Sequence, residues 1–83
     1  MNIYKISQSE NNDWDTYSDA VVVTEDENQA RQIHPDGDTK VEDWDTPCPT
    51  WATSTEKVKV ELIGIADSKF QTSEVICASF RAG

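Results

Sequence analysis

Short apolar segments separated by polar stretches make up most of the chain. Two segments alternate apolar and polar residues, which is the pattern of a strand with one buried face. The other two are continuous runs of β-branched or mixed apolar residues, typical of strands buried on both faces. The pattern therefore predicts four strands, at residues 2–7, 20–23, 57–63 and 74–80.

The alternation also predicts which side chains share a face. Tyr4 and Ile6 are expected on one face of the first strand. Residues 67–73 (DSKFQTS) read as a turn, so we expect the last two strands to pair as a hairpin. Three side chains of the third strand are expected to face the core: Val58, Val60 and Leu62.

A short helix is predicted directly after the run of valines. Thr24, followed three residues later by Glu27, matches a capping box, and acidic residues in the first turn favour a helix N-terminus. Pro35 disfavours helical geometry in the residue before it, so the helix is expected to run from Glu25 to about Ile33. So short a helix is marginally stable alone and is expected to dock on a sheet.

Two polar stretches are predicted loops. Residues 8–19 are rich in Asn, Asp and Ser, and residues 35–56 contain all three prolines and an Asp36-Gly37 turn signal. A loop as long as the second is usually functional or mobile, but Trp44 and Trp51 within it argue against full disorder.

The order of predicted elements is β-β-α-β-β. This order predicts an α+β fold with about four mainly antiparallel strands, one short helix and a long middle loop. With 83 residues, of which 36% are hydrophobic, the chain is expected to form a single domain over residues 1–83.

The composition excludes a membrane-spanning helix. Mean hydropathy is -0.66, and no apolar stretch approaches the ~20 residues that a spanning helix needs. The N-terminus, MNIYKISQ, has neither a basic region nor an apolar core, so no signal peptide is expected. The sequence favours a cytosolic protein.

Negative charge is concentrated in one half of the chain. The formal net charge is -9. Residues 10–45 hold twelve of the sixteen acidic residues and two of the seven basic ones, a net charge of -10, and the remainder carries +1. Such a field repels nucleic acid and speeds association with a positively charged partner, although an acidic surface can also serve solubility alone.

A tetrapeptide repeat is the most unusual feature of the sequence. Asp13-Trp14-Asp15-Thr16 recurs as Asp43-Trp44-Asp45-Thr46. A tryptophan between two carboxylates offers a large, rigid contact surface in a negative field, a combination typical of interface hot spots. The alternative is that each tryptophan folds back over the small core, because so short a chain needs large side chains to bury.

The acidic segment that begins at Asp13 is not expected to bind calcium. Its spacing resembles the start of an EF-hand loop, but Ser18 occupies the position that needs Gly, and Thr24 the position that needs Glu. No glycine-rich phosphate-binding motif and no serine nucleophile motif is present.

The spacing of His34, Cys48 and Cys77 matches no recognised catalytic or zinc-binding motif. These residues could form such a site only with an unrecognised spacing. Cys77 lies in the apolar run VICASF and is expected to be buried, whereas Cys48 lies between two prolines and could be exposed. His34 is expected to cap the helix C-terminus. We therefore predict no catalytic residues, no metal and no cofactor.

Four segments of the chain, YKISQ, DTYSDAVVVTEDENQARQIHP, KVKVELIG and ICASFRAG, resemble a group of small, mostly uncharacterised proteins of bacteriophages and prophages. The resemblance implies expression in the cytoplasm of an infected bacterium. It also implies an accessory role, in which such proteins bind and inhibit a host protein, including restriction or CRISPR components, sometimes by imitating the charge of DNA. Many relatives have a longer middle insertion than this chain.

The expected function is therefore that of a phage-type accessory protein that occupies a basic, nucleic-acid-binding surface on a host protein, without contacting nucleic acid itself. Trp14 and Trp44 are the expected anchors. The two rival hypotheses are self-assembly through an exposed sheet edge, for example as a homodimer, and a small enzyme or metal protein. The residues expected to bind the partner are Asp13, Trp14, Asp15, Glu42, Asp43, Trp44, Asp45 and Trp51.

Overall fold

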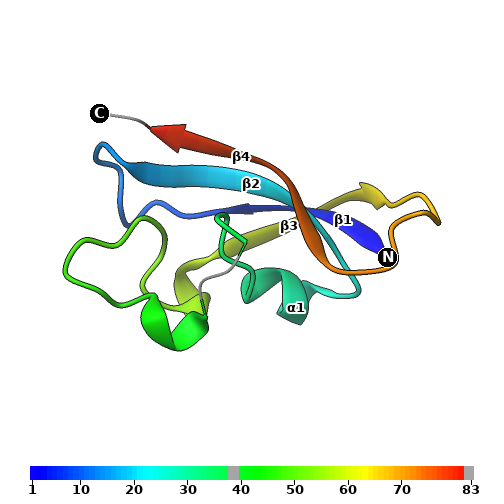
Figure 1. Cartoon of the computed structure of the whole chain (residues 1–83), viewed down its shortest axis with the longest axis horizontal. Helices are drawn as coiled ribbons and strands as arrows, with labels where there is room; N and C mark the ends of the chain where they lie inside the picture. Colours follow the sequence, from blue (N-terminus) through cyan, green and yellow to red (C-terminus); the bar gives the residue numbers. More distant parts are fainter. Residues whose placement is uncertain (38–39, 82–83) are drawn as a thin grey trace.

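The computed structural model describes residues 1–37 and 40–81 and contains one antiparallel four-stranded sheet with a short helix against it (Figure 1). The α+β class and the order β-β-α-β-β are confirmed. The elements are β1 (Asn2–Ser7), β2 (Thr16–Thr24), α1 (Glu27–Arg31), the 3₁₀ turns η1 (Val41–Asp43) and η2 (Thr55–Lys57), β3 (Lys59–Ile65) and β4 (Glu74–Arg81).

The predicted hairpin between the last two strands is wrong. The sheet order is β3-β1-β2-β4, so β3 and β4 form its opposite edges and the β1–β2 hairpin occupies its centre. The connection between β3 and β4 crosses one end of the sheet, where the Ala66 amide donates to the Met1 carbonyl (2.9 Å) and the hydroxyls of Ser73 and Thr24 lie 2.8 Å apart. Each central strand therefore gains a neighbour on both sides.

One face of the sheet, which we call the helix face, carries the core. Tyr4 and Ile6 of β1 lie opposite Val22 and Ala20 of β2, and all four side chains are buried. The helix contributes only one buried residue, Ala30. The predicted middle loop covers more of this face with three buried residues, Trp44, Trp51 and Ala52, and the buried Val58 follows just before β3.

The second strand is longer than the sequence predicts. Residues 16–19 were expected in a loop because they are polar, but they extend β2. Thr16 and Tyr17 pair with Arg81 and Phe80 of β4, and the register shift before Asp19 marks a β-bulge. Pairing with a strand some sixty residues away supplies the hydrogen bonds, so local composition could not reveal it.

The helix is shorter than predicted, and its cap is different. Asp26 is the N-cap: its carboxylate accepts from the Gln29 amide at 2.8 Å. Thr24 instead ends β2, and its hydroxyl donates to the side-chain carbonyl of Gln29 at 2.8 Å. The capping-box prediction failed because β2 continues to Thr24, so that the residue directly before the helix is Asp26.

Two apolar residues expected in the core are exposed, Leu62 and Cys77. Both lie on edge strands. Leu62 is 60% exposed, so neither the helix nor the middle loop covers it. Cys77 lies on the face of β4 opposite the helix. The alternation of apolar and polar residues correctly predicted which side chains share a face of the sheet. It could not predict that one short helix and one loop cover only part of the helix face.

Replacement of Trp51 by Ala should destabilise the fold severely, whereas Trp14→Ala should not. Trp51 is 1% exposed and Trp14 is 72% exposed. We expect Trp51→Ala to lower the free energy of unfolding by about 3–5 kcal/mol, because it leaves a large cavity. Trp14→Ala should change it by less than about 0.5 kcal/mol. Urea denaturation followed by circular dichroism measures both, and equal losses would contradict the burial of Trp51.

Candidate partner-binding groove

A groove of about 600 Å³ lies between the loop that joins β1 to β2 and the middle loop. We call it the acidic groove because two carboxylates, Asp13 and Asp15, lie in one wall. Its lining residues are Asn11, Asp13, Trp14, Asp15, Thr16, Pro47, Cys48, Pro49 and Thr50.

The first wall of the acidic groove is a tight turn that displays Trp14. The Thr16 hydroxyl donates to the Asp13 carbonyl at 2.6 Å, which closes the turn. Asp15 has a positive φ of 61°, a left-handed conformation that Asp tolerates better than most residues. Its amide donates to the carbonyl of Arg81, which ties the turn to the end of β4. These bonds fix the backbone on either side of an exposed indole.

The second wall is held by the core. The Tyr17 amide donates to the Thr50 carbonyl at 2.7 Å, and the Asn11 side-chain amide donates to the Trp51 carbonyl at 2.7 Å. Because the Trp51 ring is buried, the residues before it cannot move far from β2. Pro47 and Pro49 further restrict the backbone, since proline fixes φ near −65°.

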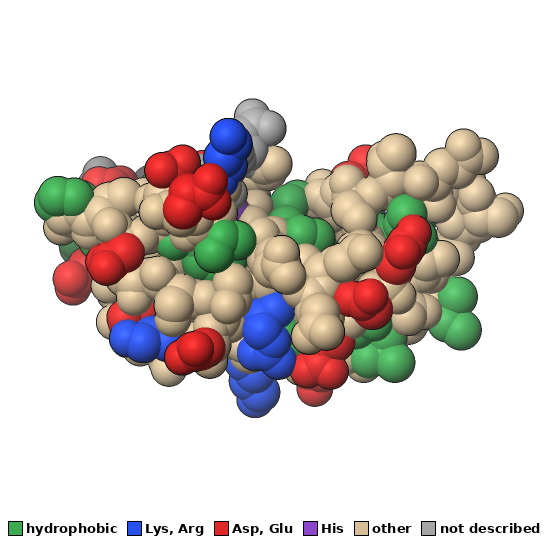
Figure 2. Space-filling model, turned by 90° about the horizontal axis from the view of Figure 1, so that it is seen from below, with side chains coloured by type: hydrophobic (Ala, Val, Ile, Leu, Met, Phe, Trp, Pro, Cys, Tyr) green, Lys and Arg blue, Asp and Glu red, His purple; other side chains and the backbone are tan. Residues whose placement is uncertain are grey.

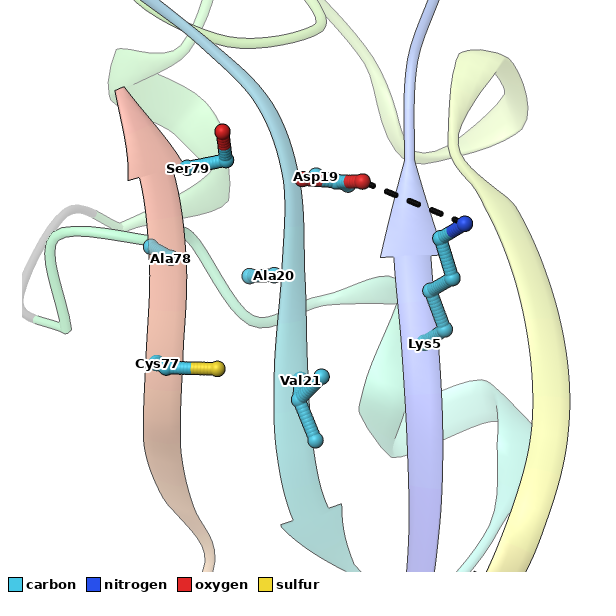
Figure 3. Close-up of a pocket in the computed structure, with 7 residues that line it drawn as sticks. All are labelled: Lys5, Asp19, Ala20, Val21, Cys77, Ala78 and Ser79. Atoms are coloured by element: carbon cyan, nitrogen blue, oxygen red, sulfur yellow. Dashed lines mark ion pairs between the residues drawn. The ribbon is translucent and has the colours of Figure 1, made fainter.

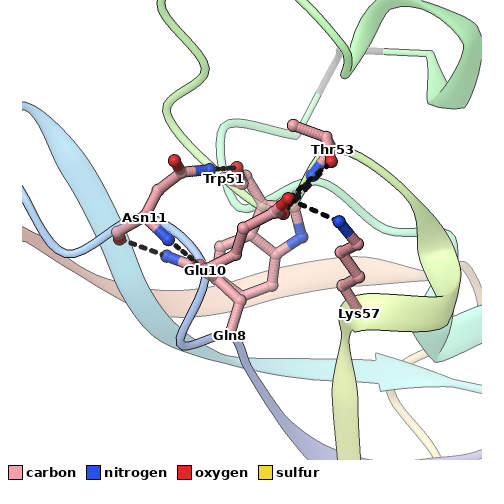
Figure 4. Close-up of polar contacts among 6 residues, drawn as sticks. All are labelled: Gln8, Glu10, Asn11, Trp51, Thr53 and Lys57. Carbon is pink, nitrogen blue, oxygen red and sulfur yellow. Dashed lines mark hydrogen bonds and ion pairs between the residues drawn. The ribbon is translucent and has the colours of Figure 1, made fainter.

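A polar clamp joins the same two loops (Figure 4). The Glu10 carboxylate accepts from the Thr53 amide at 2.9 Å, from the Thr53 hydroxyl at 2.8 Å and from Lys57 Nζ at 2.8 Å. The hydrogen bond from Lys57, followed by that from the Thr53 backbone, lowers the pKa of Glu10 from 4.5 to about 2. The ionised form of Glu10 therefore stabilises the folded arrangement.

Gln8 organises the inner part of the same loop. Its side-chain amide donates to the carbonyls of Asn11 (2.7 Å) and Tyr17 (2.8 Å), and its side-chain carbonyl accepts from the Asn11 amide (2.7 Å). Gln8 is buried, so these bonds satisfy a polar group that would otherwise be costly to bury. They hold Asn11 in place for its bond to the second wall.

His34 lies in the core and does not cap the helix, whose C-cap is Gln32. Its ring is 5.7 to 6.4 Å from three aromatic rings, and its Nδ1 accepts from the Asp36 amide at 3.2 Å. Burial lowers its pKa below 6.5, although the Asp36 carboxylate opposes that shift. The ring therefore packs as a neutral aromatic group. Its ring neighbours are Tyr17, Trp44 and Trp51.

The structure brings together only part of the predicted binding set. Asp13, Trp14 and Asp15 line the acidic groove. Trp44 and Trp51 are 2% and 1% exposed, so they belong to the core and cannot offer their rings to a partner. The expected anchor role of Trp44 does not fit this burial. The remaining acids are exposed on or next to η1, outside the groove lining: Glu42, Asp43 and Asp45.

The sequence alone did not reveal the wall formed by Pro47, Cys48 and Pro49. The Pro-Cys-Pro segment was a signal for a rigid, exposed loop, and Cys48 is indeed exposed. Nor did the sequence reveal the clamp around Glu10, whose partners lie more than forty residues away. No local pattern marks such a contact.

Figure 2 views one face of the molecule, from below the orientation of Figure 1. Carboxylates on this face are scattered over both halves, with lysine and arginine side chains between them. They do not form one continuous ridge there. The acidic field is therefore spread over this face.

A second, smaller hollow of about 270 Å³ lies on the sheet face away from the helix (Figure 3). Its charged pair is Lys5 Nζ and Asp19 Oδ2, which are 3.9 Å apart and partly exposed, so the pair contributes little to stability. The rest of the lining is small or apolar: Ala20, Val21, Cys77, Ala78 and Ser79. Nothing in this hollow resembles a reactive centre.

Comparison of the chain with known protein families, curated proteins and solved structures found no match. Among residues 1–37 and 40–81, no three side chains of His, Cys, Asp or Glu are grouped so that they could hold a metal ion. In the same residues no helix is long and apolar enough to cross a membrane.

The clamp predicts an acid-dependent loss of stability. The pKa of Glu10 is about 2 in the folded protein and 4.5 without its partners, so its contribution is complete above pH 4.5 and disappears as the pH falls towards 2. Glu10→Gln should lower the free energy of unfolding at pH 7. Between pH 4.5 and 2, the free energy of unfolding of this variant should fall less steeply than that of the native protein.

Urea denaturation at a series of pH values measures this effect. The control is Glu25→Gln, a substitution of the same type at an exposed residue outside the clamp. Its free energy of unfolding should fall with decreasing pH as steeply as that of the native protein. An unchanged decline in Glu10→Gln would show that the clamp does not act through the charge of Glu10.

Proposed function

We propose that this protein is a non-catalytic binding protein whose acidic groove holds a basic surface of a partner protein. The observation that carries the proposal is the exposed Trp14 indole, which lies on a tight turn and lines the groove together with Asp13 and Asp15. Trp14 has 72% of its surface exposed. Such exposure of a large apolar side chain is unusual in a chain with so small a core.

The chemistry of the groove favours an arginine or lysine side chain of the partner. A guanidinium can stack on the face of an indole, an interaction of about 0.5–1 kcal/mol at exposed sites and about 2 kcal/mol or more when water is excluded. The same guanidinium can form hydrogen bonds with a flanking carboxylate of Asp13 or Asp15. The two prolines and Thr50 then provide a rigid wall opposite the bound side chain.

The overall charge of -9 would assist this binding at longer range. An acidic field raises the rate of encounter with a basic protein and repels nucleic acid, and salt weakens both effects. In this proposal Glu42, Asp43 and Asp45 contribute to the field and not to the contact. Basic surfaces of this kind are common on nucleic-acid-binding proteins.

The sequence resemblance to phage proteins leads us to propose a host protein as the partner. On this hypothesis the protein acts in the cytoplasm of an infected bacterium, where it blocks or modulates a nucleic-acid-binding host protein such as a restriction or CRISPR component. Occupation of the basic surface would exclude the nucleic acid that normally binds there.

Affinity capture from bacterial lysate at low and high salt tests the proposal. The tagged native protein should retain a basic, nucleic-acid-binding protein at low salt and release it at high salt. Trp14→Ala and the double variant Asp13→Asn with Asp15→Asn should each reduce capture of that protein by about tenfold or more, the loss expected for a hot-spot residue.

The matched control neutralises two carboxylates outside the groove, with Glu25→Gln and Glu61→Gln in one protein. It has the same net charge as the Asp13 and Asp15 double variant, so it separates the groove from the general field. The control should retain at least most of the capture. Equal loss in both double variants, or undiminished capture by Trp14→Ala, would reject the groove as the binding site.

A further inference from the structure

His34 is the one histidine of the chain, and its ring lies among the contacts that hold the middle loop on the sheet. The centroid of the ring is 5.9 Å from that of Tyr17, on β2. It is 5.7 Å from the indole of Trp44 and 6.4 Å from that of Trp51, both in the middle loop. A titratable side chain therefore lies at the junction between the sheet and the loop that forms the second wall of the acidic groove.

The same ring reaches a residue of the groove itself. Its Nε2 lies 3.5 Å from the hydroxyl of Thr50, which lines the acidic groove. The carbonyl of Thr50 accepts from the Tyr17 amide at 2.7 Å, so this residue also bonds the wall to β2. A displacement of the His34 ring would therefore act on the wall at Thr50 and through the buried indole of Trp51, the next residue.

The two protonation states of His34 need different partners. Its Nδ1 lies 3.2 Å from the Asp36 amide and 3.2 Å from Asp36 Oδ1. A neutral ring that accepts the amide hydrogen at Nδ1 carries its own hydrogen on Nε2, which faces Thr50. The protonated ring carries hydrogen on both nitrogens, so Nδ1 can no longer accept from the amide but can donate to the carboxylate. Protonation therefore changes the hydrogen bonding of the turn at residues 34–36.

The surroundings of the ring favour its neutral form. Two titratable groups face it, the Asp36 carboxylate from its own turn and the Tyr17 phenol from β2. The contacts from the middle loop are two indoles and a threonine hydroxyl, which carry no charge. Burial lowers the pKa of His34 below 6.5, and the Asp36 carboxylate opposes that shift. The cation is costly where the ring lies now and is better stabilised nearer to water and to Asp36, whose side chain is 39% exposed.

We propose that protonation of His34 is a pH switch that loosens the second wall of the acidic groove. At neutral pH the uncharged ring holds Thr50 and Trp51 against β2, and the groove keeps its shape. In mildly acidic solution the charged ring moves out of its aromatic contacts towards Asp36, and residues 47–50 lose part of their support. The partner is then bound at neutral pH and released in acid, a last step that rests on the proposed function.

The pH range of the switch lies above that of the clamp. A histidine that is kept neutral in the fold stabilises the fold fully above its ordinary pKa of 6.5. This contribution is lost as the pH falls through the lower pKa of the folded protein. The contribution of Glu10 is complete down to pH 4.5, so a titration from pH 7 to 4.5 observes His34 before the clamp weakens.

Nuclear magnetic resonance of the native protein, without a histidine tag, tests the switch over this range. Because the chain has one histidine, the Cε1–H resonance reports the protonation of His34 directly. Hydrogen exchange of the Tyr17 amide reports its bond to Thr50. We expect its protection factor to fall by about tenfold or more with the midpoint of the His34 titration. The amides of Tyr4 and Ile6, in the central strand β1, should keep their protection, which separates local opening from global unfolding.

Two variants assign the effect to the ring. His34→Phe keeps an aromatic ring that cannot take up a proton, so the protection of the Tyr17 amide should not change between pH 7 and 4.5. Asp36→Asn removes the carboxylate that favours the cation, so the midpoint of the His34 titration should move to lower pH. Glu25→Gln removes the same charge at an exposed residue outside this turn and should leave that midpoint unchanged.

Three results would overturn the switch. The first is a His34 ring that stays neutral down to pH 4.5. The second is a ring that titrates while the Tyr17 amide keeps its protection. The third is the same loss of protection in His34→Phe, which would assign the opening to carboxylates. The first two need no variant, so the test stands even if His34→Phe does not fold. No partner is present in these measurements, so failure of the switch and failure of the proposed function are distinguishable.

Discussion

The fold depends on how the helix face of one small sheet is covered. A helix of five residues buries only Ala30 against it, which is too little to exclude water from β1 and β2. The indoles of Trp44 and Trp51, carried by the middle loop, supply much of the remaining covering. A large aromatic side chain buries more apolar area than any other, so two of them can replace a second helix. A segment without regular structure thus becomes part of the core.

The candidate site follows from that packing. Once Trp51 is buried, the residues that precede it must lie along the start of β2, and backbone hydrogen bonds from Tyr17 and side-chain bonds from Asn11 hold them there. The clamp at Glu10 fixes the other side of the same loop. The acidic groove is therefore a product of core packing, and Trp14 is exposed because its turn lies beyond the covered area.

The limited covering also explains the apolar surface at the edges of the sheet. The chain has too few residues to shield both β3 and β4, so apolar side chains remain exposed on each. Charges in β3 and a register shift in β4 that marks a β-bulge both reduce the risk of uncontrolled edge pairing.

The sequence alone determined the α+β class, the first strand and the order of elements, because alternation and β-branched runs act locally. It also marked Trp14 as part of an acidic turn. It could not distinguish Trp14 from Trp44, which have identical flanking residues, or show that β3 and β4 separate to opposite edges. Those outcomes depend on contacts between residues far apart in the chain. Only tertiary packing decided which tryptophan the small core had room to bury.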